Sequence, residues 1–296
     1  MKRKGITDFL FLFPCVFAFI MVIICPFILG IYYSMTDWNG INPAIQWVGL
    51  ANFQGMFKEP QFIYSFIITI AYTLINVAIV NVVSFLLSLL ATSRVKLRNL
   101  YRAGFFVPNL IGGIVLGYIW QFLFNNVFTV IGANLNIPFL QKSLIAGSGT
   151  VIWAMSLVNT WQYAGYIMMI YVAAIQSISD SIMEAASVDG ANYFTRVRRI
   201  LMPMMASAFT ISLFLTLTNS FKQFDMNFTL TNGGPSVRFA GKVVKASQLL
   251  AMDIYNTANA ANKMAEGQAK AVVFFIVLVV FSLLQVYLNK RKEVEA

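Results

Sequence analysis

The sequence has no histidine, only two cysteines and few charged residues. Of its 296 residues, 11% are charged and 59% are hydrophobic, whereas about a quarter of the residues of a soluble domain are charged. Cys15 and Cys25 both lie inside the first apolar run, so we expect neither a metal site nor a structural disulfide. The chain also lacks a GxxxxGK(S/T) phosphate loop, so it cannot hydrolyse ATP by itself. We predict an integral membrane protein without catalytic residues or a bound cofactor.

Six apolar runs are long enough to cross a bilayer, which takes about 20 residues. They lie at 9–32, 63–91, 102–125, 150–174, 203–221 and 270–288. We predict an all-α membrane protein in which residues 1–296 form a single transmembrane domain of six helices. The first run is too long for the apolar part of a signal peptide and has no small-x-small cleavage site, so we expect the protein to retain it.

The basic residues are distributed unevenly between the two sets of loops. Segments 1–8, 93–102, 176–202 and 289–296 hold three, four, three and three of the 21 lysines and arginines, whereas the opposite loops 33–62 and 126–149 hold one each. The third opposite loop, 222–269, holds five, but long loops carry little weight in the positive-inside rule. We therefore predict that both termini and segment 176–202 face the cytoplasm. The net charge of +10 then reflects membrane topology and not nucleic-acid binding.

Segment 176–202 is longer than a turn between two spans needs, and it carries helix signals of its own. Ser181 and Glu184 have the spacing of a capping box, and Gly190 is placed to end the helix in a left-handed conformation. A second helix can run from Ala191 to Ile200 and lead to Pro203, which suits the first turn of the fifth span.

Two interpretations of this segment are possible. Its helices could lie against lipid headgroups, for which Arg196, Arg198 and Arg199 would serve well. Alternatively, they could dock to a cytoplasmic protein. For the first helix the small residues Ala185 and Ala186 behind Glu184 favour docking, because small side chains permit close approach to a groove, whereas helices lying on a membrane favour bulky ones.

Two of the predicted spans carry polar side chains at i, i+3, i+4 and i+7, which places each set on one helical face. Buried in a bilayer, such groups need partners or water. They could line a pathway for a polar solute, or they could form interhelical hydrogen bonds of about 0.6–2 kcal/mol each. Neutral amides and hydroxyls beside tyrosine rings suit a sugar. The two sets are Asn159, Gln162, Tyr163 and Tyr166, and Thr216, Asn219, Ser220 and Gln223.

The stretch Glu184-Ala-Ala, Asp189-Gly-Ala191, Ile200 and Pro203 resembles the EAA loop of binding-protein-dependent ABC importer permeases. Trp47-Val-Gly-Leu-Ala-Asn-Phe53 and Leu230-Thr-Asn-Gly-Gly-Pro235 resemble the carbohydrate-uptake branch, which includes maltose and multiple-sugar permeases. Together the similarity covers nearly the whole chain. Two positions depart from the pattern: the aromatic residue that the family usually has near Val197 is absent, and Ser207 stands where the family has a later proline. The interval from Pro235 to Tyr255 is also longer than in the family.

The resemblance implies a type I ABC importer permease fold in the cytoplasmic membrane of a bacterium. It implies four kinds of partner: a cytoplasmic ATPase dimer that uses ATP-Mg, an extracytoplasmic solute-binding protein, a second and related permease, and a sugar substrate. It also implies that the solute-contacting residues lie near the two polar faces. The ATPase-coupling residues would be Glu184, Ala185, Ala186, Asp189, Gly190 and Ala191.

Two other interpretations remain open. A self-sufficient secondary carrier or channel is the main alternative, although ion-coupled carriers usually keep an ionisable residue deep in a span. Here only Lys222 and Asp225, near the end of the fifth predicted span, come close to that. A membrane scaffold that only recruits a cytoplasmic partner is the third interpretation, and the two polar faces argue against it.

Overall fold

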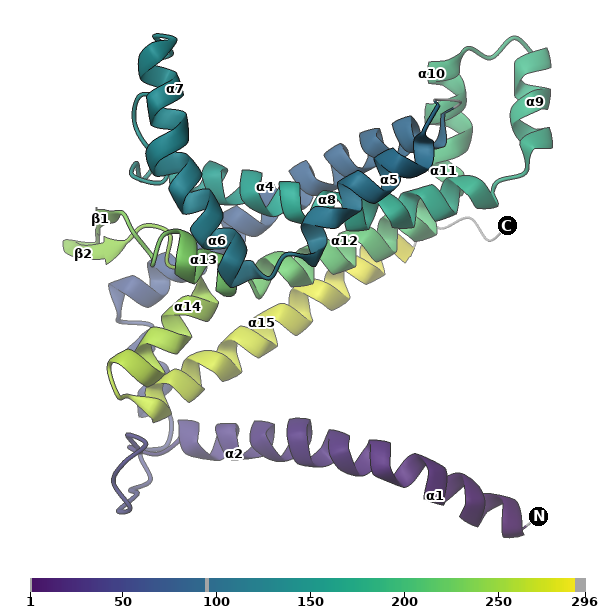
Figure 1. The fold of residues 1–296 in the computed structure, drawn as a ribbon. Helices are drawn as coiled ribbons and strands as arrows, with labels where there is room; N and C mark the ends of the chain where they lie inside the picture. Colours follow the sequence, from purple (N-terminus) through teal and green to yellow (C-terminus); the bar gives the residue numbers. More distant parts are fainter. Residues whose placement is uncertain (1, 94–95, 291–296) are drawn as a thin grey trace. The chain divides into compact units, whose positions relative to one another are not determined.

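The computed structural model describes residues 2–93 and 96–290 (Figure 1). Arg94 and the tail 291–296, which contribute to the charge count above, lie outside the described residues. The chain divides into two compact units. One comprises residues 1–63 and 253–276, and the other comprises 64–252 and 277–296.

Four helical stretches of the described chain are long and apolar enough to cross a membrane: Phe11–Ser34, Pro60–Thr92, Gly113–Asn134 and Met264–Asn289. Two further helix pairs meet the same requirement together. Val151–Ser177 and Asp180–Val188 are bent by 70° at a short break, and Tyr193–Met204 and Ala206–Phe221 by 73°. If each bent pair counts as one span, six spans result, the number predicted from the sequence.

The first unit begins with one continuous helical stretch made of α1 (Lys2–Phe19), a π-helical turn (Ile20–Ile24) and α2 (Cys25–Ser34). None of the 18-residue apolar window within Phe11–Ser34 is buried by the rest of the chain. A helix that is apolar all round needs lipid or another protein against it. Beyond α2, Asn52 in the short helix α3 (Ala51–Met56) donates hydrogen bonds to the carbonyl oxygens of Ser34 and Thr36, at 2.8 and 2.7 Å.

A buried lysine joins three segments of the first unit. Lys270, in α15 (Met264–Lys290), is 0% exposed. Its Nζ lies 2.9 Å from Asp253 in α14 (Leu250–Tyr255) and 2.7 Å from Glu59, just before α4 (Pro60–Thr92). The same ammonium donates to Thr257 in a π-helical turn (Asn256–Ala260) at 2.7 Å. Because a buried charge is costly unless it is paired, this cluster fixes the three segments against one another.

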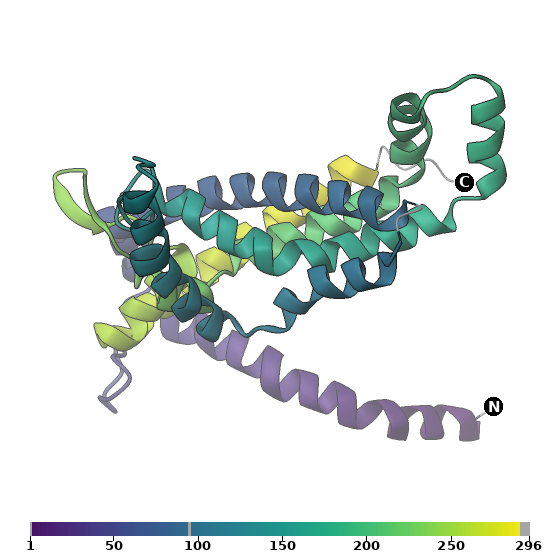
Figure 2. The same cartoon turned by 45° about the horizontal axis from the view of Figure 1, so that its top comes forward.

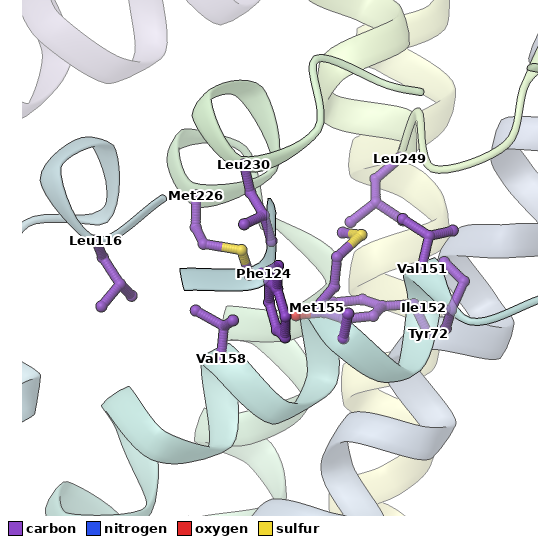
Figure 3. Close-up of a cluster of buried hydrophobic side chains, with 11 residues drawn as sticks. Tyr72, Leu116, Phe124, Val151, Ile152, Met155, Val158, Met226, Leu230 and Leu249 are labelled. Atoms are coloured by element: carbon purple, nitrogen blue, oxygen red, sulfur yellow. The ribbon is translucent and has the colours of Figure 1, made fainter. Parts of the chain in front are cut away.

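The second unit is built around α4, α8 (Val151–Ser177) and α12 (Ala206–Phe221). One apolar cluster centres on Tyr72, Phe124 and Met155, with Val158 and Leu230 packed beside them (Figure 3). A second cluster joins Val80 of α4 to Tyr171 of α8 and to Met205, just before α12. These clusters hold in place the helices that carry the polar residues described below.

The apolar run predicted at 102–125 is not one helix. The chain forms α5 (Arg98–Phe106), a 3₁₀ turn (Val107–Leu110), α6 (Gly113–Phe122), a π-helical turn (Leu123–Val127) and α7 (Phe128–Asn134). The helix is broken at Ile111, whose backbone is extended at φ −81° and ψ 123°. Pro108 within the 3₁₀ turn explains why the helical pattern ends here, since proline has no N–H for the i−4 carbonyl.

The segment after α12 packs back against α6. Here α13 (Asp225–Leu230) approaches so closely that a Cβ at Gly113 would lie 2.9 Å from the Cβ of Asp225. A β-hairpin follows, with β1 (Ser236–Phe239) antiparallel to β2 (Lys242–Lys245) and Val237 opposite Val244. Apart from these two short strands, the described chain is helical, as predicted. The hairpin occupies the interval noted above as longer than in the family.

Candidate functional site

The loop predicted at 176–202 contains α9 (Asp180–Val188), which begins differently from the prediction. The N-cap is Ser179, with extended backbone and no side-chain capping bond. The Ser181 hydroxyl lies 2.7 Å from that of Ser179. The capping box of Ser181 and Glu184 is therefore wrong, because Ser181 already lies inside the helix. Asp180 does lie in the first turn, where its charge favours the helix N-terminus.

The end of α9 confirms the prediction that Gly190 ends this helix in a left-handed conformation. Its φ is +79°, in the left-handed region. The N–H of Gly190 donates to the Ser187 carbonyl at 3.2 Å, and the N–H of Ala191 donates to the Ala186 carbonyl at 2.9 Å. These two bonds form a Schellman motif, which satisfies carbonyls at the end of the helix and turns the chain sharply.

Most residues predicted to couple to an ATPase are accessible. Glu184, Ala185, Asp189 and Gly190 are exposed, Ala191 is half-buried, and Ala186 is 8% exposed. Figures 1 and 2 both show α9 beyond the ends of α8 and α12 and separated from α10 by a loop. Val188 is 88% exposed. An accessible helix with small and apolar side chains suits docking into a groove of another protein.

The second half of the loop is helical from Tyr193 to Met204, in the order α10 (Tyr193–Arg196), a π-helical turn (Val197–Leu201) and α11 (Met202–Met204). It begins two residues later than predicted, because the Asn192 side chain caps it by accepting from the N–H of Thr195 at 2.8 Å. Pro203 lies in α11, before the bend, and not in the first turn of the fifth span. Arg196 donates to the Ser187 hydroxyl at 2.6 Å and so links the two halves.

The fourth and fifth predicted spans border a hollow of about 440 Å³ with a largely polar lining. Four residues of the two predicted polar faces line it: Gln162, Tyr163, Asn219 and Gln223. All four are partly exposed. Gln162 also donates to the Ile111 carbonyl at 2.8 Å, at the break before α6. Gln223 lies just after the end of α12, outside the helical face predicted for it. The hollow thus offers amides and one phenol ring from α8, from α12 and from the segment after α12, an arrangement that can bind hydroxyl groups.

Three other members of the predicted faces are buried between helices. Asn159, Thr216 and Ser220 are at most 1% exposed. Asn76 of α4 donates to the side-chain oxygen of Asn159 at 2.8 Å and to the Ser220 hydroxyl at 2.7 Å. Asn81, also of α4, donates to the Thr216 hydroxyl at 2.9 Å. Their geometry is that of interhelical hydrogen bonding.

Tyr166 packs against Tyr163 but does not line the polar hollow. It borders a separate, apolar hollow of about 480 Å³ together with Arg102 and Phe106, and its ring is 5.3 Å from that of Tyr163. The structure therefore divides the eight residues into a group at the polar hollow, a buried network and one separate tyrosine.

Other residues at these sites were not predicted. Thr218, Lys222, Phe224 and Asp225 also line the polar hollow. The sequence signals for them were the position of Lys222 and Asp225 near the end of the span and the resemblance of Phe224-Asp225 to the carbohydrate-uptake branch. Asn76 and Asn81 could have been found as the two amides inside the apolar run 63–91, because an amide in a span needs a partner. Within the described residues, no group of three or more histidine, cysteine, aspartate or glutamate side chains could hold a metal ion.

Comparisons with known proteins identify the same family that the sequence motifs indicated. Residues 84–294 match the family described as "Binding-protein-dependent transport system inner membrane component". The chain is 43% identical over 293 residues to the probable starch degradation products transport system permease protein AmyD of Thermoanaerobacterium thermosulfurigenes, a match that covers 99% of this chain and 97% of that one. It is 26% identical to the multiple sugar-binding transport system permease protein MsmF of Streptococcus mutans, over 91% of this chain and 90% of that one.

A solved structure shares the fold. It is a bacterial ABC transporter involved in the import of the acidic polysaccharide alginate, and a chain of it superposes with a TM-score of 0.82 at 18% identity. The match covers 98% of this chain and 96% of that one. The fold is therefore that of an ABC importer permease.

Proposed function

This chain belongs to the binding-protein-dependent transport system inner membrane components, and we propose that, as the permease subunit of an ABC importer for carbohydrates, it moves a neutral sugar or oligosaccharide inward by alternating access. It is a multi-pass inner-membrane protein and not itself catalytic. The ATP-Mg would be used by a cytoplasmic ATPase dimer, and an extracytoplasmic binding protein would deliver the solute. A second, related permease would complete the pathway, with both termini of this chain in the cytoplasm.

The observation that carries the coupling role is the exposed helix α9 with its corner at Gly190. Glu184, Ala185 and Asp189 are accessible, and the N–H of Ala191 returns to the Ala186 carbonyl. The two Schellman hydrogen bonds restrict the conformation of the turn at Gly190. A displacement of α9 can therefore be passed on to the rest of the loop. Closure of the ATPase dimer would then move α9 and, through the loop, the helix α12.

The polar hollow between α8 and α12 supports the solute role. Gln162, Asn219 and Gln223 offer neutral donors and acceptors, while Tyr163 and Phe224 offer ring faces. Sugars present many hydroxyl groups and weakly apolar ring faces, and such ligands are held by a few polar groups among aromatic ones. We assign these residues to solute contact, and we assign Asn159, Thr216 and Ser220 to holding the helices that carry them.

The test uses the complete importer, reconstituted with its binding protein, and measures ATPase activity and sugar uptake. Glu184→Lys is expected to abolish stimulation of the ATPase by the binding protein while leaving membrane insertion intact. The matched control is Glu266→Lys, which changes a partly exposed glutamate far along the chain from α9. Uptake that persists in the Glu184 variant with the ATPase still bound would contradict docking through α9. Uptake by this chain without any ATPase would instead support the secondary carrier.

A further inference from the structure

A second hollow, of about 780 Å³, borders the later half of the loop and is lined mainly by apolar side chains. Phe85, Leu86 and Leu89 of α4 contribute one side, and Ala206, Phe209 and Leu213 of α12 another. The helical segment Tyr193–Met204 closes the hollow on a third side with Tyr193, Phe194 and Arg198. A hollow of this kind suits hydrocarbon and not a sugar.

The segment that borders this hollow is oriented as an interfacial helix would be. It is bent by 73° from α12, so where α12 runs close to the membrane normal, Tyr193–Met204 lies closer to the membrane plane and forms the cytoplasmic end of this broken span. Tyr193 and Phe194 are 60% and 68% exposed. Aromatic rings concentrate at the headgroup level of a bilayer, and basic, aromatic helices of this kind lie in the interface.

The charge of this segment is entirely positive. Residues 191–221 contain Arg196, Arg198 and Arg199 and no aspartate or glutamate. Within the described part of the chain no carboxylate forms an ion pair with Arg198, which is exposed and borders the hollow. Arg196, by contrast, already donates to Ser187. The hollow therefore combines apolar walls with a cation at its border, which complements a molecule with a hydrocarbon body and a negative head.

We propose that this hollow binds an anionic phospholipid of the cytoplasmic leaflet, with its acyl chains between α4 and α12 and its phosphate on Arg198. The leaflet follows from the orientation in the proposed function, on which this inference rests. Basic pockets between spans on the cytoplasmic side bind anionic headgroups for the same reason: an arginine near the surface attracts them, and guanidinium fits phosphate oxygens.

The experiment measures lipid retention by the purified complete importer. The importer is titrated with phosphatidylglycerol or phosphatidylcholine of identical acyl chains, and bound lipid is counted by native mass spectrometry. Phosphatidylglycerol is expected to be retained more strongly. Arg198→Gln is expected to weaken its retention about five-fold, since one arginine near an anionic surface contributes on the order of 1 kcal/mol. Arg238→Gln, an exposed arginine on β1, removes the same charge and is expected to change nothing.

A second variant tests whether the apolar lining of the hollow binds the acyl chains. Ala206→Phe would narrow the hollow and is expected to reduce retention of both lipids, whereas Arg198→Gln affects only the anionic one. Equal retention of the two lipids, or no effect of Arg198→Gln, would overturn the proposal. A photocrosslinker at Ala206 that reacts with another subunit and not with lipid would also overturn it. Glu184→Lys is expected to leave lipid retention unchanged, so a failure of the coupling role and a failure of this inference give different results.

Discussion

The side-chain amide of Asn76 donates a hydrogen bond to the side-chain oxygen of Asn159 at 2.8 Å, between two helices and with both residues 1% exposed. The same amide group reaches Ser220 at 2.7 Å. One residue of α4 therefore connects α8 and α12, the two helices that border the polar hollow. The position of the hollow depends on a residue that does not line it.

We predict that Asn76→Leu lowers stability by about 1–2 kcal/mol, because it leaves Asn159 and Ser220 without their shared donor in a site where water is scarce. The measurement is unfolding in mixed detergent micelles. Asn126→Leu, at an exposed asparagine, is the control and should change stability by less than about 0.5 kcal/mol. A double-mutant cycle with Asn159→Leu should show coupling, and additive effects would contradict the bond.

Lys270→Met is expected to cost about 3–5 kcal/mol, because it leaves the carboxylate of Asp253, which is 2% exposed, without its charged partner. Lys263→Met breaks the exposed pair with Glu266, in which the side chains are 55% and 39% exposed, and should cost at most about 1 kcal/mol. The measurement is the loss of stability of each variant in thermal unfolding. Equal losses would show that the Lys270 cluster is no stronger than a surface ion pair.

Substitution of Gly190 by valine is expected to impair coupling, because a β-branched residue is strained at a φ of +79°. Gly241 at the tip of the hairpin has a φ of +76°, and a Cβ added at either glycine would meet no described atom within 4 Å. Gly241→Val therefore imposes the same backbone strain elsewhere, again without a steric clash. Binding-protein-stimulated ATPase activity should fall at least several-fold in the first variant only. A similar fall in both would indicate a general loss of structure.

Gln223→Leu is expected to raise the KM for uptake about ten-fold, by removing one hydrogen bond to the solute and leaving its partner unpaired. Ser220→Ala, one turn away but buried in the Asn76 network, should lower stability and leave the solute profile unchanged. Tyr166→Phe, at the separate hollow, is expected to preserve the profile as well. A profile that Gln223→Leu leaves unchanged would assign that residue to packing.

Local features were more accessible to sequence analysis than the division of roles among polar residues. Gly190 could be placed because only a residue tolerant of positive φ ends a helix in this way. Helical spacing could place Asn159 and Gln162 on one face. It could not predict that Asn159 would be buried by its hydrogen bond with Asn76 while Gln162 would line a hollow. That difference depends on which helix packs beside α8, and such contacts are set by tertiary packing over long sequence separations.

The break in the third apolar run, at residues 102–125, was likewise not predictable from the sequence. The composition of this run suggested one helix, and Pro108 with the pair Gly112-Gly113 was the local sign of a break. Whether a proline bends a helix or ends it depends on whether neighbouring groups satisfy the backbone that it frees. Here the helix is interrupted at Ile111, and the side chain of Gln162 in α8 donates to the Ile111 carbonyl at 2.8 Å. The sequence of residues 102–125 does not encode that contact.

This break has a consequence for the order in which the protein can be assembled in the membrane. The carbonyl of Ile111 finds its partner only on α8, 51 residues later in the chain. While the third run is being inserted that partner is still to be synthesised, and hydrocarbon offers no substitute. We therefore expect the third run to reach its final, broken shape only after the fourth has entered the bilayer beside it. A truncation between the two runs would then leave the earlier one without its final shape.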